Sequence, residues 1–235
     1  MTINRSHFAT KSRKKAQMGS VFLCAFLSLV AANAFAGGPA DDEQLIFDLQ
    51  RYGNTPEKRE AKARARDQLT ARGAEGLRRL MTKVHLENVA IAVEAENMVR
   101  TMNTQEVAAV LVDFLGDDHP RTRKLAAYWL GFHETPEYAD KVLPLLKDDE
   151  AAGAAIRTLG KWRARQAIPE IVPFLSHEKE IRRIVAANSL RDIGDPSVVP
   201  DLTPLLNDRY FTVREVAARA LSGLREAKEK QGGEQ

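Results

Sequence analysis

The sequence predicts an all-α fold, an α-solenoid of about five helix pairs, because two apolar anchors recur along the chain with one period. The first anchor is a leucine that follows paired small residues, as in AAYWLG and AAIRTLG. Its members are 29, 31 and 31 residues apart: Leu130, Leu159, Leu190 and Leu221. The second is the last leucine of an apolar cluster such as VLPLL, with members 31, 29 and 31 residues apart: Leu115, Leu146, Leu175 and Leu206. No stretch shows convincing strand alternation, so we expect helices throughout.

Each repeat contains the patterns of two helices. In the first, paired alanines precede the anchor leucine, as Ala126 and Ala127 precede Leu130, which allows neighbouring helices to approach closely. In the second, apolar residues stand at positions i, i+3 and i+4, the spacing of one helical face: Val142, Leu145 and Leu146; Ile171, Phe174 and Leu175; Leu202, Leu205 and Leu206. Turn residues such as Gly194-Asp195-Pro196 lie between helices and are suited to end one and begin the next.

The first 36 residues are typical of a secretory signal peptide. A basic region precedes the apolar run VFLCAFLSLV, and small residues stand at Ala34 and Ala36. We expect cleavage after Ala36 and a mature protein in the periplasm or outside the cell. The run is shorter than the roughly 20 apolar residues that a membrane span needs. We therefore expect no stable membrane insertion after cleavage; an uncleaved anchor is the alternative.

Removal of this leader changes the charge of the protein. The whole chain has 35 basic and 32 acidic side chains, a formal net charge of +3. Five basic residues and no acidic ones lie in the leader, so the mature chain has a net charge of −2. The basic character therefore gives no reason to expect a nucleic-acid partner. The single cysteine, Cys24, also leaves, so no disulfide framework is possible.

The remaining chain is expected to contain three parts. Residues 37–54 should hold an N-terminal capping helix, near Asp41 to Arg51, with an apolar face formed by Leu45, Ile46 and Leu49. Residues 55–228 should form the repeat array. The polar tail 229–235 contains two glycines and is expected to be disordered.

These repeats resemble HEAT repeats of the type named for phycobilisome lyases. The resemblance is carried by LAAYWLGFHETPEYADKVLPLLKD and VAANSLRDIGDPSVVPDLTPLLND and covers about Thr55 to Gly223. It implies that prolines bend the second helices at Pro144, Pro173 and Pro204, with a weaker bend at Asp113 in the preceding repeat. It also implies a row of arginines that pair with acidic residues between repeats: Arg123, Arg183 and Arg214, with a gap at Ala152.

One enzyme branch with similar repeats, the deoxyhypusine hydroxylases, holds two irons on His-Glu pairs near the start of the first helices. The equivalent pairs here are not His-Glu: Lys124-Leu125, Gly153-Ala154, Ile184-Val185 and Glu215-Val216. His133-Glu134 lies at the corner between two helices and His177-Glu178 lies between repeats, so these pairs should not converge on one metal. We expect no metal or cofactor, and we expect Thr135 to cap a helix that begins at Pro136.

Four residues are candidates for contacting a partner. Val142, Ile171 and Leu202 face the core, so the residues before them are turned about 100° away. These are Lys141, Glu170 and Asp201, which share one repeat position and should form a polar row; a solvated face without a ligand is the alternative. Trp162 follows the corner Gly160-Lys161, where we expect it to be exposed.

The sequence favours a non-catalytic protein-binding scaffold or adaptor that acts in the periplasm or outside the cell. Stacked helix pairs present an extended surface that suits another protein or a peptide. The chain has no G-x-S-x-G motif and no glycine-rich phosphate loop, although this does not decide whether it is an enzyme. The alternative is a lyase-like or hydroxylase-like HEAT-repeat enzyme, an oxidoreductase or chromophore lyase, disfavoured because the His-Glu pairs are out of phase.

Overall fold

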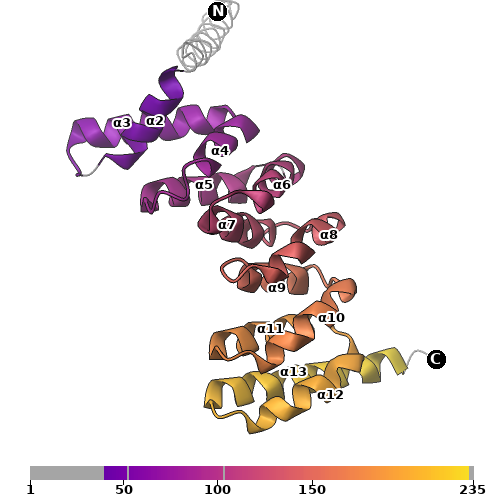
Figure 1. Ribbon diagram of the computed structural model, residues 1–235. Coiled ribbons are helices and arrows are strands. Elements are labelled where there is room, and N and C mark those ends of the chain that lie inside the picture. The colour runs from indigo at the N-terminus through magenta and orange to yellow at the C-terminus, as the bar shows by residue number, and fades with distance from the viewer. Residues whose placement is uncertain (1–39, 52, 103, 233–235) are drawn as a thin grey trace, which may run out of the picture. The chain divides into compact units, whose positions relative to one another are not determined.

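The computed structural model describes residues 40–51, 53–102 and 104–232 (Figure 1). The leader predicted for residues 1–36, with its cleavage site at Ala36, lies outside the described residues. The described residues form α-helices and short 3-10 helices and contain no strand, which confirms the all-α prediction. None of these helices is long and apolar enough to cross a membrane. The chain divides into two compact units, Met1–Ala71 and Arg72–Gln235.

In the first unit, two helices pack against each other: α2 (Ala40–Gln50) and α3 (Pro56–Ala71). Three residues predicted to form an apolar face on the first of them are buried: Leu45, Ile46 and Leu49. On α3 the buried residues recur every four positions, at Ala61, Ala65 and Leu69. The other side of α3 is charged and exposed, and includes an ion pair of 3.3 Å between Arg64 and Glu60, one helical turn apart.

The second unit begins with α4 (Ala74–Met81) and continues with four pairs, each a first helix followed by a second. The first helices are α5 (Val89–Thr101), α7 (Pro120–Leu130), α9 (Ala152–Lys161) and α11 (Glu180–Ile193). The second helices are α6 (Thr104–Asp113), α8 (Ala139–Val142), α10 (Ile168–Ile171) and α12 (Val199–Leu202). These four pairs and a further first helix, α13 (Phe211–Gly232), make up the array of the second unit, close to the number of about five pairs that the sequence predicts.

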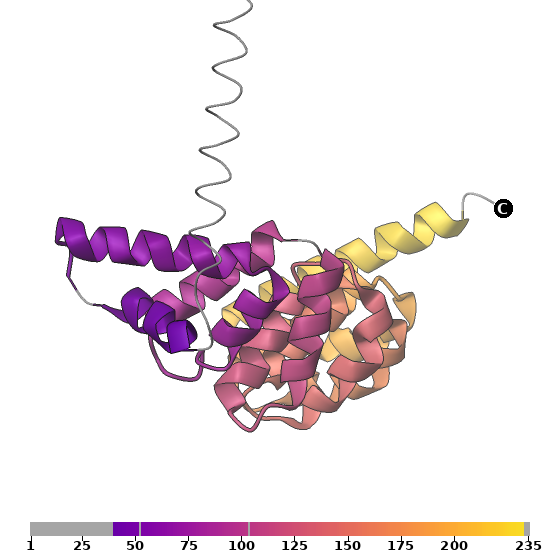
Figure 2. The same cartoon turned by 90° about the horizontal axis from the view of Figure 1, so that it is seen from above.

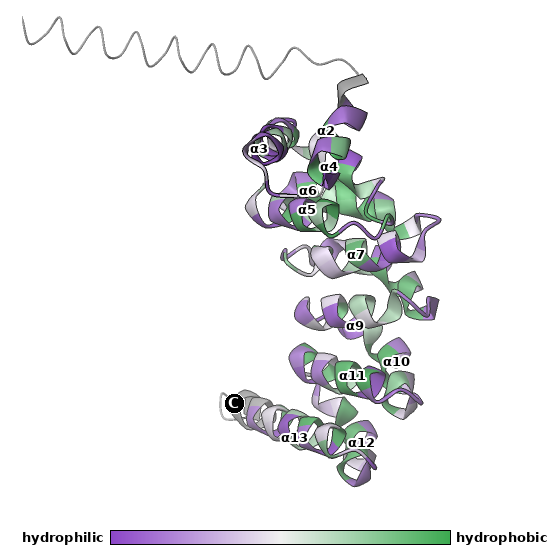
Figure 3. Ribbon diagram, turned by 90° about the vertical axis from the view of Figure 1, so that its left-hand side faces the viewer, coloured by the Kyte–Doolittle hydropathy of each residue, from purple (hydrophilic) through white to green (hydrophobic). Residues whose placement is uncertain are grey.

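The first helices of the second unit stack side by side, in the order α7, α9, α11 and α13 (Phe211–Gly232) (Figure 3). The C-terminal part of α13, yellow in Figure 2, extends beyond this stack. The helix continues through Gly232, into the segment where the sequence analysis expected a disordered tail. Residues 224–231 explain the difference, because the series LREAKEKQ contains only strong helix formers and the glycines follow it.

The second helices change from α to 3-10 geometry where the sequence places prolines. Each short α segment is continued by a 3-10 segment with proline at its second residue: η3 (Leu143–Lys147), η5 (Val172–Ser176) and η7 (Thr203–Asn207). Proline has no N–H for the i−4 carbonyl, so the α pattern cannot continue. Where Asp113 replaces the proline, α6 remains α-helical for ten residues before η1 (Phe114–Gly116).

The anchor leucines form the core of the array. Leu130, Leu159 and Leu190 are fully buried, and Leu221 is nearly so. In the second row Leu206 is the exception, with 40% of its surface exposed. Leu206 lies in the last second helix of the described chain, so no later second helix packs over it.

Two glycines let neighbouring first helices approach closely. A Cβ at Gly131 would lie 2.5 Å from Thr158 Oγ1, and a Cβ at Gly160 would lie 2.6 Å from Ser189 Cβ and 2.7 Å from its Cα. The Thr158 hydroxyl donates a hydrogen bond of 2.7 Å to the carbonyl of Ala127. The contacts of α9 with α7 and α11 therefore leave no space for an additional carbon at these glycines.

Candidate binding groove on the first helices

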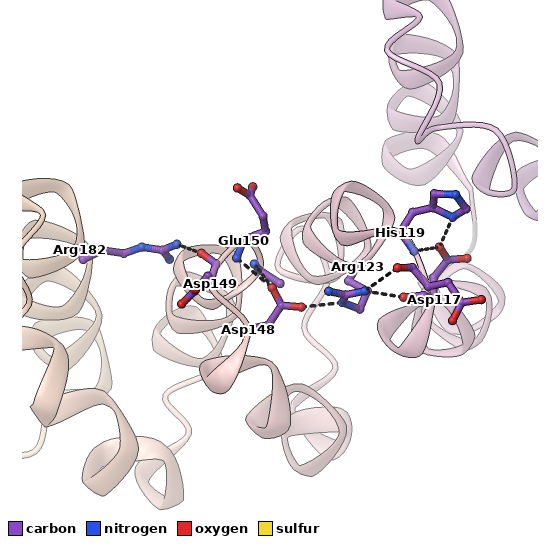
Figure 4. A network of polar contacts seen from close by, with 9 residues as sticks. Asp117, His119, Arg123, Asp148, Asp149, Glu150 and Arg182 are labelled. Carbon is purple, nitrogen blue, oxygen red and sulfur yellow. Dashed lines mark hydrogen bonds and ion pairs between the residues drawn. The ribbon is translucent and has the colours of Figure 1, made fainter.

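Arginine–aspartate pairs connect successive repeats beside the candidate site. Arg123 Nε donates to Asp148 Oδ2 at 2.6 Å, and its Nη1 donates to the carbonyls of Asp117 and Asp118 at 2.8 and 3.1 Å (Figure 4). The other oxygen of Asp148 accepts hydrogen bonds from the backbone N–H groups of Glu150 and Ala151. One arginine thus fixes the loop before its own helix and the aspartate in the loop before the next first helix. We call this pair a rung.

A second rung has the same geometry. Arg183 Nε and Nη2 donate to the two carboxylate oxygens of Asp208 at 2.7 and 2.9 Å, and Nη1 donates to the carbonyls of His177 and Glu178. Arg183 is 6% exposed, so this is a largely buried, bidentate pair. The two rungs confirm the pairing expected for Arg123 and Arg183, but the structure does not show the pairing expected for Arg214. Arg214 donates only to the carbonyls of Asp208 and Arg209, and it makes no ion pair with a described residue.

The rungs set the ionisation of their carboxylates. Burial raises the pKa of Asp148 and of Asp208, but hydrogen bonds from the rung arginines and from backbone N–H groups, together with the arginine charges, lower the pKa further. The net result in both cases is a pKa below the ordinary value of 3.8. Both carboxylates are therefore ionised at neutral pH and hold their arginines through charge-assisted bonds.

The repeat between these two has no rung, because neither the arginine position nor the aspartate position holds the residue found in the other two repeats. Ala152 stands where the arginine would be, which confirms the expected gap, and His177 stands where the aspartate would be. His177 keeps one part of the aspartate's role, because its Nδ1 accepts the backbone N–H of Lys179 at 3.0 Å. Arg182 instead reaches back from α11 and donates to the carbonyl of Asp149 (Figure 4).

A groove opens over α9 at this gap. Its volume is about 510 Å³. Gly153 and Ala154 form its floor. At the position of Gly153, α7 has Lys124 and α11 has Ile184. At the position of Ala154, α7 has Leu125 and α11 has Val185. The two small residues leave a depression between helices that have larger side chains at this level. The groove thus occupies the positions that the resemblance assigns to His-Glu pairs in the hydroxylases.

The walls of the groove are apolar. Leu125 and Tyr128 come from α7, and Ile181 and Val185 come from α11. Ile181 is 59% exposed, a large fraction for an aliphatic side chain. Tyr128 packs edge-on against Phe132, with ring centres 5.1 Å apart, which holds its ring beside the groove. Exposed apolar surface of this kind in a concave site is typical of ligand-binding sites.

The rim of the groove carries more basic than acidic groups. The basic residues are Lys124, Arg157, Lys179 and Arg182, and the acidic ones are Asp149 and Glu150. Lys124 forms an ion pair of 3.3 Å with Glu150. Arg157 lies 5.8 Å from the centre of the Tyr128 ring. Within the described part of the chain, neither Arg157 nor Lys179 forms an ion pair.

Further positive charge lies next to Arg157. Arg100 lies 3.8 Å and Lys161 lies 5.4 Å from the centre of the Phe132 ring. Burial lowers the pKa of Lys161, and the charges of Arg157 and Arg100 lower the pKa further, while Asp192 opposes them. Lys161 also donates to the carbonyl of Gly131 at 2.9 Å. The basic rim therefore continues from the groove toward Phe132.

The polar row predicted on the second helices lies on other elements than the groove. Lys141 is on α8, Glu170 on α10 and Asp201 on α12, and all three are exposed. Val142, Ile171 and Leu202, which follow them, are fully buried. None of the three row residues lines the groove, and their role in binding remains a prediction.

Trp162 differs from its predicted exposure. Its side chain is only 8% exposed, and its indole N–H donates to the carbonyl of His133 at 2.6 Å. The ring packs into the corner because it has a hydrogen-bond acceptor there, one repeat earlier in the chain. The sequence pattern around Gly160-Lys161 did not reveal that acceptor.

His133 lies at the corner where the sequence places it. Its Nδ1 is 3.3 Å from Thr104 Oγ1, and burial lowers its pKa below 6.5, opposed by a hydrogen bond with the backbone of Val99. Thr135 precedes the 3-10 helix η2 (Pro136–Tyr138) as expected, but its hydroxyl makes no capping hydrogen bond within the described chain. Across the described residues, no three His, Cys, Asp or Glu side chains are grouped to hold a metal ion.

Comparisons with known proteins match part of the chain. Residues 147–222, from the end of η3 into α13, match the family model for HEAT repeats. A search of curated proteins found no significant match.

Solved structures that resemble the chain include an engineered protein from the Northeast Structural Genomics Consortium. It has 18% identity and a TM-score of 0.49, over 80% of this chain and 97% of that one. Another is a designed armadillo repeat protein in complex with the peptide (KR)4. It has 18% identity and a TM-score of 0.48, over 77% of this chain and 98% of that one.

Proposed function

We propose that this protein, whose residues 147–222 match HEAT repeats, is a non-catalytic scaffold that binds another protein or a peptide. The observation that carries the proposal is the groove over α9, a concave site with apolar walls and a basic rim on the first helices. An array of stacked helix pairs holds such a site on rigid elements, which reduces the entropy lost on binding.

A photo-cross-linking experiment tests the groove as the contact surface. A benzoylphenylalanine is placed at Ile181 in the groove, at Glu170 in the polar row, or at Ala218 on the exposed side of α13, and the variants are expressed in the native cells. We expect one discrete cross-linked protein from position 181 and none from position 218. Cross-links from position 170 alone would move the contact surface to the second helices. Equal cross-linking from all three positions would contradict a specific site.

We further propose that the protein acts in the periplasm or outside the cell. The support is the sequence of the leader, with its basic start, short apolar run and Ala34-Phe35-Ala36. Mass spectrometry of the native protein should find Gly37 as the first residue. An intact Met1, or recovery of the protein from the cytosol, would contradict the proposal.

The enzyme alternative predicts a different property of the purified protein. A hydroxylase-like member would carry iron, and a lyase-like member would carry or handle a coloured ligand. Elemental analysis and the visible absorption spectrum of protein purified from its native source distinguish these from a scaffold. Stoichiometric iron or a bound chromophore would replace the scaffold proposal.

A further inference from the structure

We propose that the groove over α9 binds an acidic peptide segment that carries a bulky apolar side chain. This inference rests on the proposed protein-binding function and names the chemistry of the partner. Two features of the groove support it independently: its apolar walls and the basic groups at its rim that lack an ion-pair partner.

The apolar walls fit one large side chain of the partner. Leu125, Ala154 and Val185 hold the same repeat position on three neighbouring helices, and Ala154 is the smallest of them. A partner side chain that enters above Ala154 would contact Leu125 on one side and Val185 and Ile181 on the other. The volume of about 510 Å³ is within the range of roughly 300–1,000 Å³ found for ligand sites.

The basic rim fits carboxylates on either side of that anchor. Arg157 and Lys179 come from α9 and from the start of α11, and neither forms an ion pair within the described chain. Their charges are therefore available to a partner without breaking an internal bond. The charge of Arg157 also repels that of Lys161, and an incoming carboxylate would reduce this repulsion.

The groove fits a peptide better than a nucleic acid. Asp149 and Glu150 line it together with the basic residues, and they would repel the closely spaced phosphates of a nucleic-acid strand. A peptide can place carboxylates at intervals and avoid these two acids. Only a peptide with apolar side chains also uses the apolar walls.

A peptide selection on the purified full chain tests the inference. A random peptide library is displayed on phage and selected on the protein, and the peptides obtained are labelled and measured by fluorescence anisotropy. We expect enrichment of peptides with a net negative charge and at least one Leu, Ile, Phe or Trp. Their affinity should fall with rising salt, because exposed charge pairs contribute to it.

Two pairs of variants locate the binding. Ala154→Leu restores the side chain that α7 carries at the equivalent position and should weaken the selected peptides at least tenfold; Ala218→Leu, on the exposed side of α13, should leave affinity unchanged. Replacing Arg157 and Lys179 together by Gln should weaken binding roughly tenfold, about threefold for each charge. The matched control replaces Arg219 and Arg225, two exposed basic residues of α13, by Gln.

The outcomes separate this inference from the proposed function. Basic or uncharged peptides that lose affinity on Ala154→Leu would keep the groove as the binding site but overturn its acidic partner. Peptides that bind Ala154→Leu as well as the unmodified protein, or a selection without groove-dependent acidic peptides, would overturn the inference. A DNA oligonucleotide whose binding depends on Ala154 would overturn it in favour of a nucleic-acid partner.

Discussion

Replacement of glycine by alanine at two positions of α9 should have different effects, because the space around the two glycines differs. At Gly160 the new Cβ would lie 2.7 Å from the backbone Cα of Ser189 on α11. Carbon atoms in contact prefer about 3.5–4.0 Å, so α9 and α11 would have to separate locally. At Gly153 the nearest group is the guanidinium of Arg182, which a flexible side chain can move away.

The expected free energies of unfolding follow from these contacts. Overpacking against backbone destabilises by about 1–3 kcal/mol. The higher helix propensity of alanine than of glycine stabilises by at most about 1 kcal/mol. Gly160→Ala should therefore destabilise the protein by about 1–2 kcal/mol. Gly153→Ala gains the same propensity and loses one exposed hydrogen bond from Arg182, worth about 0.5–1 kcal/mol. Its net effect should lie within about 0.5 kcal/mol of zero.

Urea unfolding followed by circular dichroism at 222 nm measures the difference. For a slope near 2 kcal/mol per molar urea, the midpoint of Gly160→Ala should fall by about 0.5–1 M. Gly116→Ala is the control, since no side chain or backbone from elsewhere in the fold lies within 4 Å of the added carbon. Equal midpoints for the Gly160 and Gly153 variants would refute the close contact between α9 and α11.

Three further predictions concern the rungs, the core and the polar row. Arg183→Ala should destabilise by roughly 2–4 kcal/mol because it leaves the largely buried Asp208 without its partner. Urea unfolding of the variant and the unmodified protein from pH 7 to pH 2 measures this loss, which should shrink below about pH 4. The reason is that Asp208 has a lowered pKa in the folded protein. The stabilisation by its carboxylate is complete above the ordinary value of 3.8 and disappears as the pH falls through the lowered pKa. A loss that is constant with pH would show that the carboxylate is not involved. In calorimetry, Leu159→Ala should cost about 2–5 kcal/mol and His133→Ala less than about 1 kcal/mol, since only Leu159 is fully buried; equal costs would contradict the corner position of His133. The charge of the exposed polar row is reversed by Lys141→Glu, Glu170→Lys and Asp201→Lys together. The melting temperature should stay almost unchanged, and partner capture should fall if the row is a second contact surface. Unchanged capture would show that the row is not a contact surface.

The period of the sequence was sufficient to predict the array, and the resemblance to HEAT repeats implied the arginine pairs between repeats. The anchor leucines and the arginine row recur at fixed intervals, and a fixed interval places residues at the same level of successive repeats. In the structure Arg123 meets Asp148 and Arg183 meets Asp208, whereas Arg214, at the same repeat position, has no carboxylate partner among the described residues. The proline positions likewise fixed where the second helices change to 3-10 geometry.

The groove could not be predicted from the period, because it arises where one repeat departs from it. The sequence analysis aligned Gly153-Ala154 with Lys124-Leu125 and Ile184-Val185, but only as possible metal-ligand positions. The available signal was their small volume beside larger neighbours. How open the depression remains depends on the side chain of Arg182, which lies against Gly153. Trp162 shows the same limit, since its burial depends on a carbonyl one repeat away.

The rungs also define where this chain could be cut and rejoined. The arginine of a rung precedes its aspartate by 25 residues, so both lie in one stretch that ends at the aspartate. The stretches 118–148, 149–177 and 178–208 each contain a matched pair: Arg123 with Asp148, Ala152 with His177, and Arg183 with Asp208. A duplication or deletion of one whole stretch leaves every pair matched. A crossover that joins the helical corner after Leu130 to the residue after Leu159 would set Arg123 opposite His177, which has no carboxylate. We therefore expect exchange of repeats to be tolerated better at the loop aspartates than at this corner.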